Sequence, residues 1–169
     1  IALPLIASII SGFFGKYIGD RNSEIVTSLL VTISAILSAV VLYEVIFNQY
    51  QDNIIIATWI SSGTLDVNWS MKIDSLSAIM LVVVNSVSSL VHIYSIGYMS
   101  HDPHKPRFMA YLSLFTFAML MLVTSDNFIQ LFFGWEGVGL CSYFLIGFWF
   151  KKDSANAAAI KAFVVNRVG

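Results

Sequence analysis

The sequence predicts an all-α membrane protein with about six transmembrane helices, the sixth incomplete. Of the 169 residues, 57% are hydrophobic and only 11% are charged, whereas a soluble domain has roughly 25% charged residues. The apolar residues form long runs that short polar loops separate. As a helix, the run at 128–150 would extend about 34 Å, which matches the ~30 Å hydrocarbon layer of a bilayer.

Six ranges are expected to be the helices of one transmembrane domain. Pro4 is tolerated in the first turn of the first helix. The polar residues 19–23 and the proline-containing loop 101–107 separate successive helices, and a residue of the Ser-Asp-Asn stretch 125–127 can cap the helix that follows it. The expected helices are 3–18, 25–43, 75–99, 108–124, 128–150 and 155–169.

The segment 48–74 interrupts this helical pattern. Charged residues return, and Trp59 and Trp69 lie on either side of a Ser-Ser-Gly turn. Alternation and turn together predict a small β-hairpin around 54–70, at the membrane interface where tryptophan is enriched. The alternative interpretation is an irregular loop outside the membrane.

Loop charges predict how the helices are oriented. Short loops rich in Lys and Arg stay on the cytoplasmic or matrix side of a membrane. Alternate loops carry six basic residues on one side and only Lys72 on the other. The loops 101–107 and 151–156 are therefore expected inside, and the N-terminus and the hairpin segment outside. The six inner residues are Lys16, Arg21, Lys105, Arg107, Lys151 and Lys152.

Glu136 is the one acidic or basic residue within the apolar range 128–150. An acidic residue at the centre of a membrane helix costs about 2.5–3.5 kcal/mol, so the carboxylate must take up a proton, reach water or face a partner inside a helix bundle. Each outcome suggests proton handling. Gly134, Gly137 and Gly139 would let a neighbouring helix approach closely. In the alternative interpretation, a hydrogen-bonded Glu136 only locks helices together.

The predicted orientation gives a depth for the other buried charges. Counting ~1.5 Å per residue from the inner basic loops, Glu136 and Arg167 both lie about 22 Å deep, and His92 and Lys161 about 14 Å deep. Glu136, Lys161 and His92 are thus candidates for a proton relay. Arg167 cannot lose its proton and is expected to hold a charge in place.

Two of these residues have simpler interpretations. Lys161 lies only a few turns from the inner surface, so its side chain could extend to the lipid headgroups. His92 lies in a helix with Asn85 and several serines, and such polar side chains face neighbouring helices. A histidine hydrogen-bonded between helices would therefore explain His92 without any role in proton transfer.

Three stretches match one known family in order and spacing. They are LVHIYSIGYMSHDPHKPRFMAYLSLFTFAMLMLVTSDNF at 90–128, GWEGVGLCSYFLIGFW at 134–149 and AAIKAFVVNRVG at 158–169. The sequence strongly resembles the chain 5 family of NADH-ubiquinone oxidoreductase, respiratory complex I. This family is the distal antiporter-like subunit of the membrane arm. The match is detailed from about Trp59 onward and looser before it.

The resemblance implies a proton-translocating subunit that couples electron transfer from NADH to quinone to proton pumping. Glu136 matches the family's helix-five glutamate of the proton channel, and Lys161 matches a lysine of helix six. In the family, that glutamate works with a lysine on helix seven, and the family motif continues after Gly169 with an aspartate. The chain is therefore expected to be the N-terminal part of a larger helical bundle, whose remainder another segment or polypeptide carries.

The expected cofactors lie outside this chain. The single cysteine cannot ligate an iron–sulfur cluster, and no Gly-x-Gly-x-x-Gly turn follows a strand, so flavin, iron–sulfur clusters and quinone are expected in other subunits. The expected partners are other membrane-arm subunits, a neighbouring antiporter-like subunit and lipids. Nucleic acid is not expected, because the net charge is −1.

The location and one alternative function follow from the same resemblance. A composition rich in Ile, Asn, Ser and Phe suggests an AT-rich genome and a mitochondrial inner membrane, with a bacterial plasma membrane as the alternative. The large subunit of a multi-component sodium/proton antiporter shares this architecture and needs no redox partner. It is the alternative function.

Overall fold

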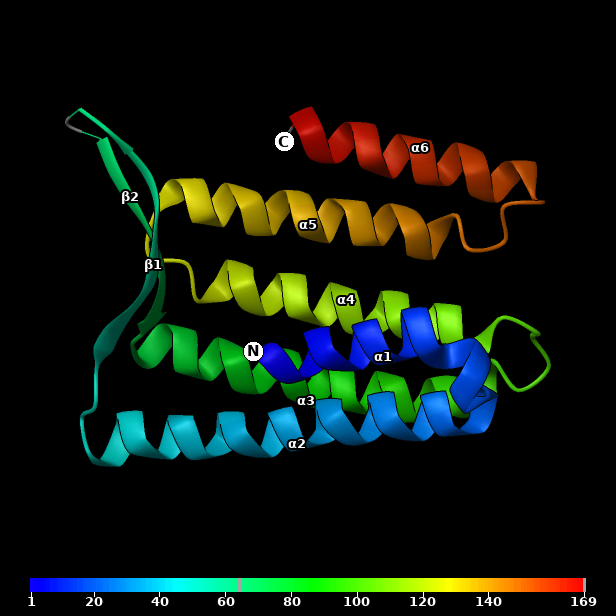
Figure 1. The fold of residues 1–169 in the computed structure, drawn as a ribbon, viewed down its shortest axis with the longest axis horizontal. Coiled ribbons are helices and arrows are strands. Elements are labelled where there is room, and N and C mark those ends of the chain that lie inside the picture. The colour runs from blue at the N-terminus through cyan, green and yellow to red at the C-terminus, as the bar shows by residue number, and fades with distance from the viewer. Residues whose placement is uncertain (64, 169) are drawn as a thin grey trace.

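The computed structural model describes residues 1–63 and 65–168, and within them the chain forms six helices and one two-stranded sheet (Figure 1). The helical membrane fold and its small hairpin are therefore confirmed. Gly169, the last residue of the predicted sixth helix, lies outside the described residues. The elements are α1 (Ala2–Ile18), α2 (Asp20–Phe47), β1 (Asp52–Ser62), β2 (Leu65–Ile73), α3 (Ser75–Tyr98), α4 (Lys105–Val123), α5 (Phe128–Ile146) and α6 (Asp153–Val168).

Four of the helices within the described residues are long and apolar enough to cross a membrane, namely α2, α3, α4 and α5. Helix α1 is apolar but has 17 residues, and α6 has 16 residues and carries three of the chain's charged side chains. At ~1.5 Å per residue these two helices extend about 24–26 Å, somewhat less than the hydrocarbon layer.

The turn between α1 and α2 is shorter than predicted. The predicted polar turn at 19–23 is wrong, because Gly19 alone reverses the chain and α2 begins at Asp20. Gly19 has φ of 87°, a conformation that glycine adopts without steric cost. Asp20 then lies in the first helical turn, where an acidic side chain interacts favourably with the helix dipole.

Three other helix ends differ from the prediction by three or four residues. Helix α2 ends at Phe47 rather than 43. Helix α4 begins at Lys105 rather than 108, because Pro106 fits the first turn of a helix, where no backbone N–H is needed. Helix α5 ends at Ile146 rather than 150, and the backbone N–H of Gly147 closes it by donating to Tyr143 O at 3.0 Å. An ideal Cβ on Gly147 would lie 3.3 Å from Ala159 Cβ, so α6 passes close by.

The hairpin forms where the sequence predicts it, and the irregular-loop alternative is wrong. Strands β1 and β2 pair antiparallel from Asp52 opposite Ile73, with register shifts around Ile56 and Trp59. Gly63 at the tip has φ of 61°. The hairpin projects from one end of the helix bundle, and the loops α1–α2, α3–α4 and α5–α6 gather at the opposite end (Figure 1).

Strand β2 is attached to the start of α5 by two side-chain amides, which hydrogen-bond to the backbone of the strand. Gln130 is fully buried; its Nε2 donates to Ser70 O at 2.7 Å, and its Oε1 accepts from Ser70 N at 3.1 Å. Asn127 caps α5 by accepting from Gln130 N, and its Nδ2 donates to Asn68 O at 2.9 Å. The cap within 125–127 is thus confirmed as Asn127.

The helices form a central group and an edge. Helices α1 and α3 each contact both α2 and α4, and α2 also contacts α4; α5 packs on α4, and α6 packs on α5 at the edge of the molecule (Figure 1). The interface of α2, α3 and α4 is rich in neutral polar side chains that form hydrogen-bonded pairs. These pairs are Ser34 with Asn85, Thr32 with Ser89, and Ser88 with Thr116. As predicted, four polar residues of α3 face other helices, whereas Ser86 is exposed; the four are Asn85, Ser88, Ser89 and His92.

Candidate functional site

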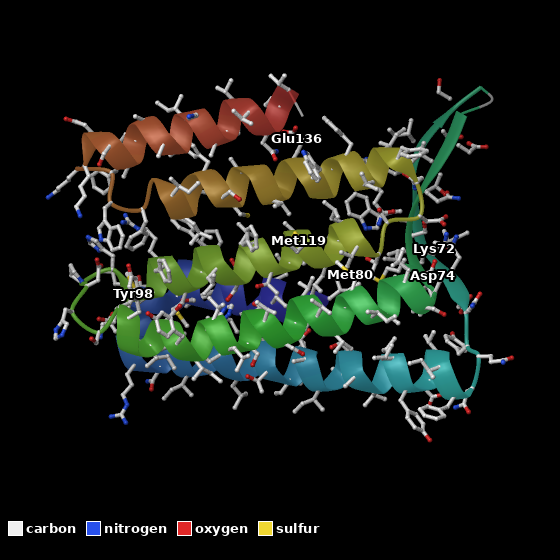
Figure 2. All side chains as sticks on the ribbon, turned by 180° about the vertical axis from the view of Figure 1, so that it is seen from behind. Lys72, Asp74, Met80, Tyr98, Met119 and Glu136 are labelled. Atoms are coloured by element: carbon white, nitrogen blue, oxygen red, sulfur yellow. The ribbon has the colours of Figure 1, made fainter. Side chains whose placement is uncertain are left out.

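Glu136 lies on α5 among three glycines that bring the flanking helices close. An ideal Cβ on Gly134 would lie 2.8 Å from Leu122 Cα, and one on Gly137 would lie 3.3 Å from Ala118 Cβ, both on α4. Gly139 faces the other way, directly against the Asn166 side chain of α6. The glycines thus allow close packing on both sides of α5, as predicted, and Glu136 lies on the side of α6 (Figure 2).

The partner of Glu136 is Arg167. Arg167 Nε lies 2.7 Å from Glu136 Oε2, which is the distance of a charge-assisted hydrogen bond. The matching depths predicted from the sequence therefore correspond to direct contact. The carboxylate side chain is 19% exposed and the arginine side chain 55% exposed. The pair is thus covered on the side of Glu136 and open on the side of Arg167.

Aromatic groups support the arginine. Its guanidinium carbon lies 4.7 Å from the ring centroid of Phe163, one turn earlier on α6, and a cation over an aromatic ring is attracted electrostatically. Trp135, beside Glu136, donates from Nε1 to Asn166 O at 3.3 Å, next to Arg167. Trp135 of α5 and two residues of α6, Phe163 and Asn166, therefore align the ion pair.

The ion pair sets a carboxylate against a guanidinium that cannot lose its proton. Any change in the position of α6 relative to α5 would alter the contact between these two groups.

Lys161 does not join this pair. It is exposed on α6, and no ion pair connects it to an acidic residue among residues 1–63 and 65–168. Six residues separate Lys161 from Arg167, which is about 9 Å along the helix. These observations agree with the simpler interpretation, in which the Lys161 side chain extends to the lipid headgroups.

His92 of α3 lies apart from the ion pair and is fully buried against α4. Its Nδ1 lies 2.8 Å from Ser88 O, and its Nε2 lies 3.0 Å from Ser113 Oγ. A carbonyl oxygen only accepts, so Nδ1 carries the proton and Nε2 accepts from the Ser113 hydroxyl. Both ring nitrogens are thus satisfied by two helices, which is what the simpler interpretation of His92 expects.

One buried acidic residue, Glu24, was not predicted from the sequence. Glu24 of α2 is 5% exposed, and its Oε1 lies 3.9 Å from Lys105 Nζ. It was missed because α2 was expected to begin at residue 25, which placed Glu24 in a loop. The Gly19-Asp20 pair was the available signal, since an acidic residue after a glycine is typical of a helix start.

Two family models match the sequence of this chain. The first describes the N-terminus of chain 5 of NADH-ubiquinone oxidoreductase (complex I) and matches residues 59–109, including His92. The second describes the transmembrane part of NADH:quinone oxidoreductases and Mrp antiporters and matches residues 125–169, including Glu136, Lys161 and Arg167.

Curated relatives match over the whole chain. NADH-ubiquinone oxidoreductase chain 5 of Arabidopsis thaliana is 57% identical over 169 residues, which are 100% of this chain and 25% of the relative. The chain belongs to the chain 5 family of NADH-ubiquinone oxidoreductase. Subunit L of the NADH-quinone oxidoreductase of Rhodobacter capsulatus is 56% identical over 98% of this chain and 24% of the relative. The chain thus spans about a quarter of the length of these family members.

A solved structure has the same fold. One chain of the membrane-bound sulfane sulfur reductase, an archaeal respiratory membrane complex, superposes with a TM-score of 0.79 and 20% identity, over 97% of this chain and 32% of that chain. This likeness shows the fold. The family and the four long apolar helices together confirm the predicted multi-pass location in an inner membrane.

Proposed function

We propose that this chain is the N-terminal part of a proton-translocating membrane-arm subunit of NADH:ubiquinone oxidoreductase. The ion pair between Glu136 and Arg167 is the observation that carries the proposal, because ionisable groups inside a membrane protein mark ion or proton pathways. The family membership supplies the enzyme in which such a pathway would work.

In the proposed mechanism, Glu136 is the group that takes up and releases the proton. While Arg167 holds the carboxylate, Glu136 stays charged, and withdrawal of the guanidinium lets a proton bind. Arg167 itself keeps its proton throughout and acts as the gate of the site. A conformational signal from the redox reaction would move α6 relative to α5 and so change the charge on Glu136.

Lys161 and His92 are the further members of the proposed relay. Lys161 lies on the same helix as Arg167, nearer to the predicted inner surface, where an amine can exchange protons with water. His92 bonds through both ring nitrogens, and an imidazole so placed can accept a proton at Nε2 and release the one at Nδ1. Its carbonyl partner at Ser88 O would have to be exchanged for a water during this transfer.

The redox chemistry is proposed to occur in other subunits. This chain has one cysteine, too few for an iron–sulfur cluster, so flavin, iron–sulfur clusters and quinone would be bound elsewhere in the complex. Its partners would be the other membrane-arm subunits, including a neighbouring antiporter-like subunit, and the segment that completes the bundle. The proposed membrane is the mitochondrial inner membrane, with the bacterial plasma membrane as the alternative.

The large subunit of a multi-component sodium/proton antiporter is the second candidate, because the family model for residues 125–169 includes Mrp antiporters. Purifying the native complex from detergent-solubilised membranes and identifying its companions by mass spectrometry separates the two. Flavin and iron–sulfur subunits alongside the chain support the respiratory proposal. Small hydrophobic antiporter subunits without a redox protein would establish the second candidate.

The site itself is tested by Glu136→Gln, which keeps the size of the side chain and removes its charge. Loss of a positioned proton donor or acceptor typically slows a proton transfer on the order of 10²-fold. We therefore expect the assembled complex to pump far fewer protons per NADH oxidised. Proton uptake and NADH oxidation are measured together in sealed vesicles.

Glu44→Gln is the matched control. Glu44 lies exposed at the hairpin end of α2, so the same chemical change there should leave pumping unaltered. An assembled Glu136→Gln complex with the proton-to-electron ratio of the Glu44→Gln complex would show that Glu136 serves only to hold helices together.

A further inference from the structure

A basic hollow lies at the end of the bundle where the loops α1–α2 and α3–α4 meet, and we propose that it binds the phosphodiester headgroup of an anionic membrane lipid. Its volume is about 470 Å³. Three basic side chains and one acidic side chain line it: Lys16 from α1, His104 and Arg107 from the start of α4, and Asp20 from the start of α2. This inference does not depend on the proposed proton translocation.

The hollow has rigid walls, because α1 and α4 are in very close contact beside it. Ser11 Oγ donates to Pro106 O at 2.8 Å. An ideal Cβ on Gly15 would lie 2.6 Å from Pro106 Cβ, closer than real Cβ atoms come, so only glycine fits there. The side chains that line the hollow are therefore presented by helix ends whose relative position is fixed, which lowers the entropic cost of binding.

The charges of the lining suit one phosphodiester. Lys16 and Arg107 contribute two positive charges and Asp20 one negative charge, so the lining is positive even with His104 neutral. The hollow also lies at the N-terminal end of α4, whose first backbone N–H groups and dipole favour an anion. A phosphodiester with one negative charge would thus neutralise the lining, whereas a cation would be repelled by Lys16 and Arg107.

Arg107 has hydrogen-bonding capacity left for such a ligand. One terminal nitrogen donates to Phe148 O at 3.3 Å, and the guanidinium carbon lies 4.7 Å from the Phe148 ring centroid. Its Nε–H is buried and has no acceptor among residues 1–63 and 65–168. Since Nε is covered, a ligand in the hollow would bond to the terminal nitrogens, and a phosphate oxygen is the acceptor that guanidinium geometry suits best.

The position of the hollow favours a lipid over a free phosphate. It lies at the end of the apolar helices, at the predicted inner headgroup level, and basic pockets between transmembrane helices on that side bind anionic headgroups. Below the charged residues the lining continues with Gly12, Ala110 and Tyr111, a small-residue and aromatic wall against which an acyl chain can lie. A soluble phosphate has no acyl chain to place against this wall.

The test uses a photo-crosslinkable phosphatidylglycerol in native membranes that contain the assembled complex. Lys16→Gln should lower the crosslinking of this chain about tenfold, because it removes a charge-assisted contact to the phosphate. Asp20→Asn should raise it, because it removes the one negative charge of the lining. Lys151→Gln, which removes an exposed charge from the neighbouring inner loop, should change nothing.

Competition identifies the ligand. Unlabelled phosphatidylglycerol should displace the probe, while vesicles of phosphatidylcholine and millimolar inorganic phosphate should not. Equal labelling in Lys16→Gln, Asp20→Asn and Lys151→Gln complexes would refute the site, as would equal competition by phosphatidylcholine. Displacement by inorganic phosphate alone would show a soluble-anion site and refute the lipid. Arg107→Gln removes the charge of Arg107 and should lower the labelling. If that variant fails to assemble, Arg107→Lys, which keeps the charge but not the guanidinium, should still label less than the native chain.

Discussion

Two helix interfaces in this molecule bury polar groups at membrane depth by opposite means. The interface of α2, α3 and α4 uses neutral groups that satisfy one another, such as Ser34 with Asn85 and His92 with Ser113. The interface of α5 and α6 uses one full charge on each helix, Glu136 and Arg167. Neutral hydrogen bonds between membrane helices stabilise packing, whereas charges at that depth are expensive and mark function.

Burial distinguishes the two interfaces further. His92 and Ser113 are fully buried, so nothing outside the α2–α3–α4 interface can alter their bonds. The Arg167 side chain is 55% exposed, so a group outside this chain can compete with Glu136 for it. The His92 and Ser113 bonds therefore form within these residues, whereas the Arg167 side chain has surface left for a further contact.

The largest expected effect comes from replacing Arg167, because its loss breaks the charged interface. Arg167→Gln should leave Glu136 without its cation, and pumping should fall on the order of 10²-fold. Arg167→Lys should retain part of the pumping, since it keeps the charge but not the planar contact over Phe163. Both are measured as protons moved per NADH oxidised in sealed vesicles. Equal pumping by Arg167→Gln and native complexes would remove Arg167 from the site.

His92 tests the neutral interface. His92→Leu should destabilise it by about 1–3 kcal/mol, because the Ser113 hydroxyl and the Ser88 carbonyl would lose a buried partner. The yield and thermal stability of the assembled complex should therefore fall. His92→Gln, which can still donate and accept, should recover most of the stability.

The same two variants decide whether His92 also relays protons. Glutamine cannot pass a proton between two ring nitrogens, so a relay predicts a stable His92→Gln complex that pumps poorly. A stable His92→Gln complex with native pumping would confine His92 to packing. This outcome would sharpen the difference between the neutral interface and the charged one.

The sequence predicted the charged interface better than the helix ends. Depth counting paired Glu136 with Arg167, because helix rise is constant and both residues are measured from one loop. It could not show contact, since rotation about the helix axis depends on packing, here on Gly139 against Asn166. The start of α2 and the end of α5 were misplaced for a related reason. A single glycine lies at each of these two ends, Gly19 before α2 and Gly147 after α5. Whether a glycine ends a helix depends on the residues packed around it in the fold, which the local sequence does not show.

The attachment of the hairpin could not have been predicted from local pattern. The alternation around Trp59 and Trp69 predicts two strands, but Gln130, which bonds the backbone of Ser70, lies 60 residues away. A lone glutamine at the start of an apolar helix has no spacing that identifies such a contact. Trp69 also packs on Phe133 of α5, with ring centroids 5.1 Å apart. Long-range docking of this kind follows only from the assembled fold.

The smallest expected effect concerns Asp74, where the hairpin joins α3 outside the membrane. Asp74 caps α3: its Oδ1 accepts from Ser77 N at 2.8 Å, and its backbone N–H donates to Ser77 Oγ at 2.8 Å. Asp74→Ala should cost about 1 kcal/mol of local stability, and Asp74→Asn much less, because asparagine is as good a cap. Amide hydrogen exchange at 75–78 should then be about fivefold faster in Asp74→Ala.

This cap also has a definite pH dependence. The hydrogen bond from the Ser77 backbone N–H, which favours the carboxylate, lowers the pKa of Asp74 below its usual value. A carboxyl group whose pKa is lower in the folded state adds stability above the unfolded pKa of about 3.9, and that stability is lost as the pH falls through the lowered folded value. The difference in exchange between Asp74 and Asp74→Asn chains should therefore be constant from pH 6 to 8 and change only in strong acid. A difference that varied near neutral pH would place the titration at another group. Neither charged interface residue should respond to this substitution, since Asp74 lies at the hairpin end of α3 and Glu136 lies between α5 and α6 (Figure 2).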